Sequence, residues 1–186
     1  LEDRLEETLL GNGDKLMVAR VKVQCDVARD IEKPDPSFVL SLKINGDIFY
    51  PGKESEVIIS IESSQEGYIT MVGAANDTVT VLLPNSFLKD NKLKAKELFD
   101  FPSKGLRSQG VHLRVELPSG RSRAAEGIIA VVTKDPVPFD AGILTGAEGV
   151  IPTYKAAVDD LNRWLSQIPP SRRTAQMTQY EIRQKK

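Results

Sequence analysis

The stretch from Gly67 to Asn85, GYITMVGAANDTVTVLLPN, carries the clearest β signal in the chain. Two runs rich in apolar and β-branched residues, 68–73 and 78–83, flank the short polar link Ala75-Asn76-Asp77. Such side chains favour strands, and Asn-Asp is typical of turns. The stretch therefore predicts two antiparallel strands joined by a tight turn, the second ending at Pro84-Asn85.

Upstream of this stretch, apolar residues again occupy alternate positions. Residues 38–44 follow this period of two, and the strong turn pair Asn45-Gly46 comes directly after them. The pattern predicts a strand that turns back as a hairpin into residues 48–50. A further alternating run at 57–61 is expected to join the two strands above in a three-stranded meander.

Downstream, a charged loop is expected over residues 89–97. Its anchors in the core are expected to be Leu98, Phe99 and Phe101. Residues 111–116 alternate, which predicts a half-buried strand. Residues 127–133 are apolar at nearly every position, which predicts a strand covered on both faces and central in its sheet.

The pattern changes to helical spacing over residues 153–168, with Thr153 as the expected N-cap and Pro169-Pro170 as the stop. Because proline has no backbone N–H, the helix predicted over residues 153–168 cannot continue past 168. A last strand is expected over residues 175–183.

At the other end, residues 2–10 are rich in helix formers, which predicts a helix. Residues 17–26 alternate and predict a strand with Cys25 on its inner face. Pro34 and Pro36 then stand among charges, which favours a domain boundary.

Together these patterns predict a mainly β fold: an antiparallel Ig-like β-sandwich of about seven or eight strands with one C-terminal amphipathic helix packed on it. Residues 1–33 are expected to be the tail of a preceding envelope domain, and residues 34–186 the sandwich itself. The helix is expected to bury Tyr154, Leu161 and Leu165.

The charge balance and hydropathy exclude several classes of function. There are 25 Lys and Arg against 26 Asp and Glu, so no net field favours nucleic acid. No apolar run reaches the roughly 18 residues of a bilayer span. The chain begins at Leu1 rather than Met, so we expect it to derive from a longer product.

Few residues suit catalysis or metal binding. His112 is the only histidine and its phase points away from the core, while Cys25 is expected to pack inside. The carboxylate pairs Asp159-Asp160 and Glu54/Glu56 lie in solvated stretches. Gly142, Gly146 and Gly149 match no phosphate-binding motif. We therefore expect no catalytic, cofactor-binding or metal-binding residues, and no cofactor.

The order of motifs resembles a bacterial family catalogued as domain of unknown function 4384. The resemblance lies in the Gly-Tyr that opens one strand, the Leu-Pro-Asn that ends the next, and the Leu-Pro-Ser-Gly at 117–120, and it extends over about residues 38–183. The motif positions carried over are Gly67, Tyr68, Pro84, Asn85, Pro118 and Gly120.

The resemblance implies a β-sandwich-like module found in envelope lipoproteins and fused to kinases or caspase-like peptidases. It implies no activity, so the first hypothesis is a non-catalytic binding or scaffolding module of a bacterial cell-envelope lipoprotein. Such a module would lie in the periplasm or at the outer membrane, held by a lipid anchor outside this sequence. Its partner would be a protein or another envelope component.

The alternative is a sensor or regulatory domain fused to a cytoplasmic kinase or caspase-like peptidase. A third hypothesis, a hydrolase using acidic residues, would require two carboxylates converging in an apolar pocket. The sequence names no ligand and no oligomeric state.

Overall fold

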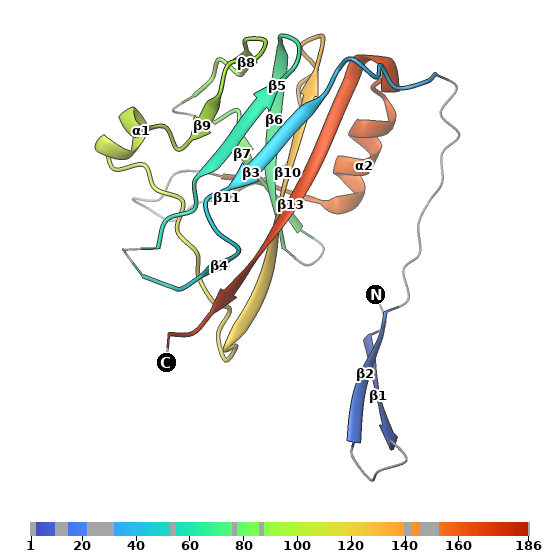
Figure 1. The fold of residues 1–186 in the computed structure, drawn as a ribbon, viewed down its shortest axis with the longest axis vertical. Coiled ribbons are helices and arrows are strands. Elements are labelled where there is room, and N and C mark those ends of the chain that lie inside the picture. The colour runs from blue at the N-terminus through green and yellow to red at the C-terminus, as the bar shows by residue number, and fades with distance from the viewer. Residues whose placement is uncertain are drawn as a thin grey trace.

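The computed structural model describes residues 3–9, 15–21, 32–52, 55–75, 78–85, 88–139, 143–145 and 153–185. The fold is mainly β, with 44% strand and 13% helix, so the prediction of a mainly β protein is confirmed. Figure 1 shows long, twisted strands crossing the domain, with the helix α2 (Val158–Ser166) beside them.

The larger sheet has eight strands. Its pairs are antiparallel except that β4 runs parallel to β13, and β8 adds to the side of β6. In spatial order its strands are β11 (Ile143–Thr145), β12 (Thr153–Ala157), β7 (Thr78–Leu83), β6 (Gly67–Ala75), β10 (Arg123–Thr133), β13 (Arg173–Arg183) and β4 (Ile48–Phe49), with β8 (Lys92–Leu93) off this path.

A second, three-stranded sheet has the order β3 (Leu40–Ile44), β5 (Ile59–Ser63) and β9 (Phe99–Phe101). A separate two-stranded sheet pairs β1 (Asp3–Leu9) with β2 (Lys15–Val21). The described helical segments besides α2 are α1 (Lys104–Ser108) and the 3-10 turn η1 (Pro170–Arg172).

The main core lies between the two larger sheets, because alternate residues of their strands meet there. Leu42 and Ile61 of the small sheet share one hydrophobic cluster with Ile69, Met71 and Val132 of the large sheet. Each strand therefore turns every second side chain toward this core. We call this side of the large sheet its inner face.

The intervening residues of the large sheet form a second hydrophobic cluster. Val72 of β6 and Val131 of β10 belong to it, together with Leu161, Trp164 and Ile168 from α2 and the turn after it. Val72 follows Met71 and Val131 precedes Val132, so this cluster lies on the opposite, outer face of the sheet. Both faces of β10 are therefore covered, as its apolar run predicts.

Strand pairing corrects two predictions. The hairpin of β6 and β7 is present, but β5 pairs with β3 and β9 in the other sheet, so the three-stranded meander is wrong. The predicted hairpin at Asn45-Gly46 is also wrong, because β4 pairs with β13 instead of β3. Asn45 instead bonds across to the start of β5: its side chain accepts from Ile58 N–H and donates to the Glu56 carbonyl.

Helix predictions required correction at both ends of the chain. The helix predicted over residues 2–10 is wrong for its described part: residues 3–9 form β1, since seven residue pairs with β2 outweigh a weak local propensity. Residues 153–157 form β12, which pairs with β7, so the N-cap is Ala157 rather than Thr153. Leu161 is buried and Leu165 half-buried, while the Tyr154 side chain lies outside the described residues.

Two smaller expectations also fail. Residues 111–116 form no strand and make a single bridge, Glu56 to Arg114, although Val111 and Val115 are buried at alternate positions. Leu98 is 62% exposed and so does not anchor the core, whereas Phe101 is 3% exposed and does.

Candidate functional site

The family motif positions have structural roles in the backbone: they allow strands to pair closely or they close turns. Gly67 begins β6 so close to β10 that an added Cβ would lie 2.7 Å from both the Thr133 carbonyl oxygen and Val132 Cγ1. No other residue fits there without displacing backbone. Its neighbour Tyr68 is half-buried, and its carbonyl accepts a hydrogen bond from the Thr133 hydroxyl.

The other motif positions close turns. The Asn85 side chain donates to the Leu82 carbonyl and accepts from the Leu88 N–H, both at 2.8 Å, directly after the cis peptide before Pro84. Gly120 has φ of +74°, a conformation that favours glycine, and the Pro118 carbonyl accepts from the N–H of the following residue, Arg121. These six positions are distributed along the fold and do not converge on one site.

The structure brings His112 to an acidic partner. Its Nδ1 lies 2.8 Å from Glu56 Oε1, and Arg107 approaches the other carboxylate oxygen at 3.8 Å. His112 is on the surface, as expected. Cys25, Glu54 and the glycines 142, 146 and 149 lie outside the described residues, while Asp160 pairs with Arg163 in its own helix.

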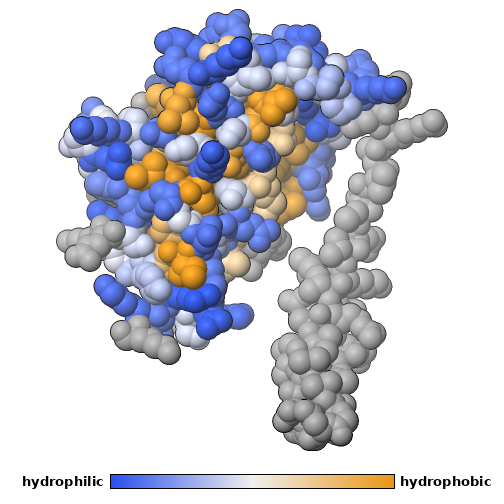
Figure 2. Space-filling view, viewed as in Figure 1, coloured by the Kyte–Doolittle hydropathy of each residue, from blue (hydrophilic) through white to orange (hydrophobic). Residues whose placement is uncertain are grey.

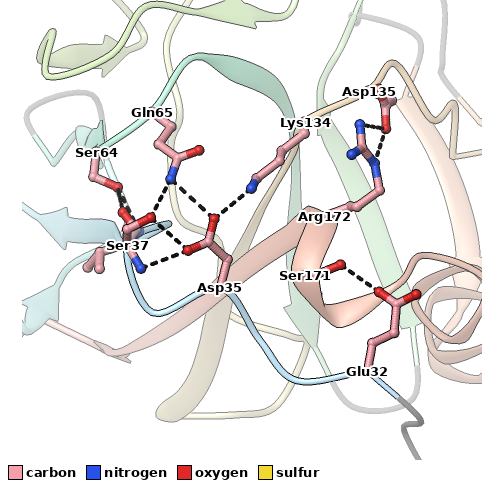
Figure 3. A network of polar contacts seen from close by, with 10 residues as sticks. Glu32, Asp35, Ser37, Ser64, Gln65, Lys134, Asp135, Ser171 and Arg172 are labelled. Atoms are coloured by element: carbon pink, nitrogen blue, oxygen red, sulfur yellow. Dashed lines mark hydrogen bonds and ion pairs between the residues drawn. The ribbon is translucent and has the colours of Figure 1, made fainter.

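A polar network fastens the segment that leads into the domain (Figure 3). Asp35 accepts hydrogen bonds from Lys134 at 2.6 Å, from the Ser37 N–H and hydroxyl, and from Gln65. The Lys134 ammonium and these donors hold the pKa of the Asp35 carboxyl well below its usual range. The network ties residues 35–37 to the ends of β5 and β10.

Two further contacts extend this fastening. Ser171 donates to Glu32 at 2.6 Å, and Arg172 pairs with Asp135 beside it (Figure 3). The charged and polar groups of this network form hydrogen bonds and ion pairs with one another. We therefore interpret the network as a structural attachment and not as a binding site for a ligand.

An open cleft lies on the inner face of the large sheet. Its volume is about 160 Å³, and it opens where the loop around Leu113 covers the ends of β6 and β10. Its wall is mainly apolar, with four polar side chains. The lining residues are Val57, Gly73, Ala74, Ala75, Thr80, Leu82, Leu113, Arg114, Glu126, Ile128 and Tyr180.

Gly73 keeps this cleft open. It pairs with Ile128 on one side and Thr80 on the other, in the middle of the sheet, where a side chain would be expected. A Cβ added there would meet only Leu82 Cδ1, at 3.8 Å. The space is therefore empty because the strand has a glycine at this position.

Tyr180 and Glu126 face each other across β13 and β10, and the Tyr180 hydroxyl donates to Glu126 Oε2 at 2.5 Å. Tyr180 is 8% exposed, and its ring stacks edge-on against Phe49. Burial, reinforced by the Glu126 carboxylate, raises the pKa of Tyr180 far above its usual range. Tyr180 therefore remains a proton donor, and it orients the carboxylate.

Arg114 supplies the opposite charge at the same cleft. Its side chain is exposed and, within the described part of the chain, makes no hydrogen bond or ion pair. Glu126 Oε1 is likewise without a protein donor there, and no ion pair joins the two residues. Among the described residues, the cleft therefore has a guanidinium without an ion-pair partner and a carboxylate with one oxygen that accepts no hydrogen bond.

Sequence reasoning missed this site because its members are far apart in the chain. Glu126 and Tyr180 are separated by 54 positions. The one local signal is Gly73, a glycine inside a strand pattern, which indicates a bulge or a close approach.

A second hollow of about 290 Å³ lies beside β9, with Leu88, Phe99 and Leu106 in its wall. Its acidic member, Asp100, already accepts from the Ser60 hydroxyl at 2.6 Å. Among the described residues, no basic side chain lines this hollow, so it lacks the pair of opposite charges that line the cleft on the inner face.

Among the described residues, no group of three or more His, Cys, Asp or Glu lies close enough to hold a metal ion. Within that same part of the chain, no helix combines the length and hydropathy needed to cross a bilayer.

Comparison with known families supports the resemblance seen in the sequence. Residues 49–136 match the family described as Domain of unknown function (DUF4384), a narrower range than the motifs indicate. All the cleft-lining residues except Tyr180 lie within it. No curated protein and no solved structure matches the chain.

Proposed function

Starting from the DUF4384 match over residues 49–136, we propose that the domain is a non-catalytic binding module and that the inner-face cleft is its binding site. The observation that carries this proposal is the pairing of an apolar wall with the uncompensated Arg114 and Glu126. Binding sites typically combine apolar walls with a few polar groups that fix orientation.

The chemistry at the cleft favours binding over catalysis. Among the described residues that line the cleft, Glu126 is the single carboxylate, whereas the hydrolase hypothesis requires two carboxylates converging in one pocket.

The exposed surface supports the same choice. On the face drawn in Figure 2, apolar side chains appear in separate patches divided by hydrophilic ones. A flat docking face for a large partner usually offers one continuous apolar patch. On this face, therefore, no single continuous apolar patch competes with the recessed cleft as a candidate binding site.

The setting and the finer architecture are part of this proposal. The family resemblance supports a bacterial cell-envelope lipoprotein, in the periplasm or at the outer membrane. The two hydrophobic clusters, one between the sheets and one beneath α2, support an Ig-like sandwich with the C-terminal helix packed on it.

A sensor or regulatory domain fused to a kinase or peptidase is the second candidate. The observation that favours it is the Asp35 network, which attaches residues 35–37, at the start of the domain, to the ends of β5 and β10. Such an attachment would transmit a change in the domain to whatever precedes it. Reading the full-length gene product for a leader with a lipid-accepting Cys, or for a kinase or peptidase domain, separates the two settings.

The proposed function is tested by a fragment screen followed by NMR. The isotope-labelled chain is titrated with a library of small polar and apolar fragments, alongside the Gly73→Val variant. We expect hits whose amide shifts centre on Gly73, Ile128 and Tyr180, and their loss in Gly73→Val because valine fills the cleft.

Gly127→Ala is the matched control, since it changes a glycine of the neighbouring strand on the outer face. There a new Cβ meets only the flexible end of Met177 closely, at 2.8 Å. Hits should survive this substitution. A screen without hits at the cleft, in a chain with a well-dispersed spectrum, would contradict the proposed function.

A further inference from the structure

We propose that the cleft binds an apolar α-amino acid, either free or as the C-terminal residue of a peptide. Arg114 would hold the carboxylate, Glu126 the amino or amide N–H, and the apolar wall the side chain. This inference rests on the proposed function and specifies its ligand.

Arg114 indicates that one end of the ligand is an anion. A guanidinium presents paired N–H donors that match a carboxylate, and such bidentate contacts are among the stronger hydrogen bonds. Arg114 lies on the loop that covers the cleft, exposed and, in the described residues, without an acidic partner of its own. Its side chain is free to close over a bound carboxylate.

The N–H of the ligand follows from Glu126. One carboxylate oxygen is occupied by the Tyr180 hydroxyl at 2.5 Å, which fixes the orientation of the group. The other oxygen has no protein donor among the described residues and lines the same cleft. A carboxylate with one open acceptor suits an ammonium or an amide N–H.

One ligand can meet both opposite charges, because the two side chains line the same cleft. Arg114 and Glu126 line a single cleft, yet no ion pair joins them. A ligand with a single charge would contact only one of the two charged side chains. An α-amino acid presents a carboxylate and an N–H on one carbon, which matches both groups at once.

The volume of the cleft limits the size of the side chain that the ligand can have. A volume of about 160 Å³ is well below the several hundred Å³ of typical binding sites for drug-sized ligands. A cavity of about 150 Å³ is known to accept benzene. The apolar wall of Leu82, Ile128 and Val57 therefore fits one side chain of the size of leucine.

The inference is tested by NMR titration of the whole chain with four ligands. L-leucine and N-acetyl-L-leucine keep the carboxylate and the N–H, L-leucinamide lacks the carboxylate, and L-alanine lacks the large side chain. We expect saturable shifts at the cleft for the first two, and affinities at least tenfold weaker for the last two. A preference for N-acetyl-L-leucine over L-leucine assigns the ligand to a peptide C-terminus, and the reverse to the free amino acid.

Charge-neutral variants test the assigned contacts. Arg114→Gln should weaken leucine binding by about tenfold to a hundredfold, as expected for loss of a charged hydrogen bond. Arg121→Gln, which removes an exposed arginine in the turn after Pro118, should have no effect. Glu126→Gln and its control Glu116→Gln test the N–H contact in the same way.

Equal affinity for L-leucine and L-leucinamide, or an Arg114→Gln variant with unchanged affinity, would overturn the inference. If other fragments bind at the cleft but none of the four ligands does, the inference fails while the proposed function stands. If nothing binds there, the proposed function itself fails.

Discussion

At the scale of single residues, two glycines of one strand have opposite roles. Gly67 is required because β10 lies against it, with the Thr133 carbonyl 2.7 Å from the position of a Cβ. Gly73, six positions along β6, has free space above it. The first glycine allows the strands to pair closely, and the second keeps the cleft open.

The glycine pair gives a direct prediction. Gly67→Ala should lower the free energy of unfolding by about 1–3 kcal/mol, because the new methyl group forces backbone apart. Gly73→Ala should leave it unchanged or raise it by about 0.5–1 kcal/mol, because alanine orders the unfolded chain. Urea unfolding of both variants checks this, and equal losses would contradict the distinction.

Asp35 gives a prediction of pH dependence. Its folded pKa lies below the ordinary 3.8, so its contribution to stability is present above that pH and is lost as the pH falls further. Asp35→Asn should therefore be less stable than the parent chain at pH 7, and the gap should shrink below pH 3.8. Denaturation at pH 7 and pH 3 measures both gaps, and a gap that widens in acid would refute the assignment.

At the scale of elements, the two main sheets meet along β3 and β13 through a side chain. The Gln176 amide oxygen accepts the Leu42 N–H at 2.6 Å, and no backbone ladder joins these strands. Such a contact replaces a ladder bond at the sheet edge. Removing it leaves a backbone donor without its partner.

This contact can be tested alone. Gln176→Leu should cost about 1–3 kcal/mol, because the Leu42 N–H becomes unsatisfied. Gln179→Leu is the matched control, since Gln179 is exposed and, among described residues, has no side-chain partner. Urea unfolding compares the two, and hydrogen exchange at Leu42 should accelerate in the first variant alone.

The elements also show what local sequence can predict. The hairpin of β6 and β7 and the buried β10 follow from turn chemistry and apolar runs, which are local signals. Sheet membership does not, because β4 pairs with β13 more than a hundred positions away. The predicted start of α2 is wrong because residues 153–157 have helical spacing in the sequence yet form β12, which pairs with β7. The edge of β7 is available for this pairing only in the folded sheet, so local sequence does not reveal it.

At the scale of the whole molecule, the cleft exists because the small sheet covers only part of the inner face. Beyond it, the loop around Leu113 and Arg114 closes over Gly73 and Ile128 incompletely. The site could not be predicted from the sequence, since its charged members lie on separate elements. A sequence in which no catalytic motif is recognised and a cleft that we propose as a binding site are therefore compatible features of one fold.

The most direct test of the cleft as a binding site uses adjacent residues on opposite faces of β10. Ile128 lines the cleft on the inner face, while Ile129 belongs to the hydrophobic cluster beneath α2. Intermolecular nuclear Overhauser effects are measured between a bound fragment and the methyl groups of the two residues. The account predicts contacts to Ile128 and none to Ile129; contacts to Ile129 alone would contradict it.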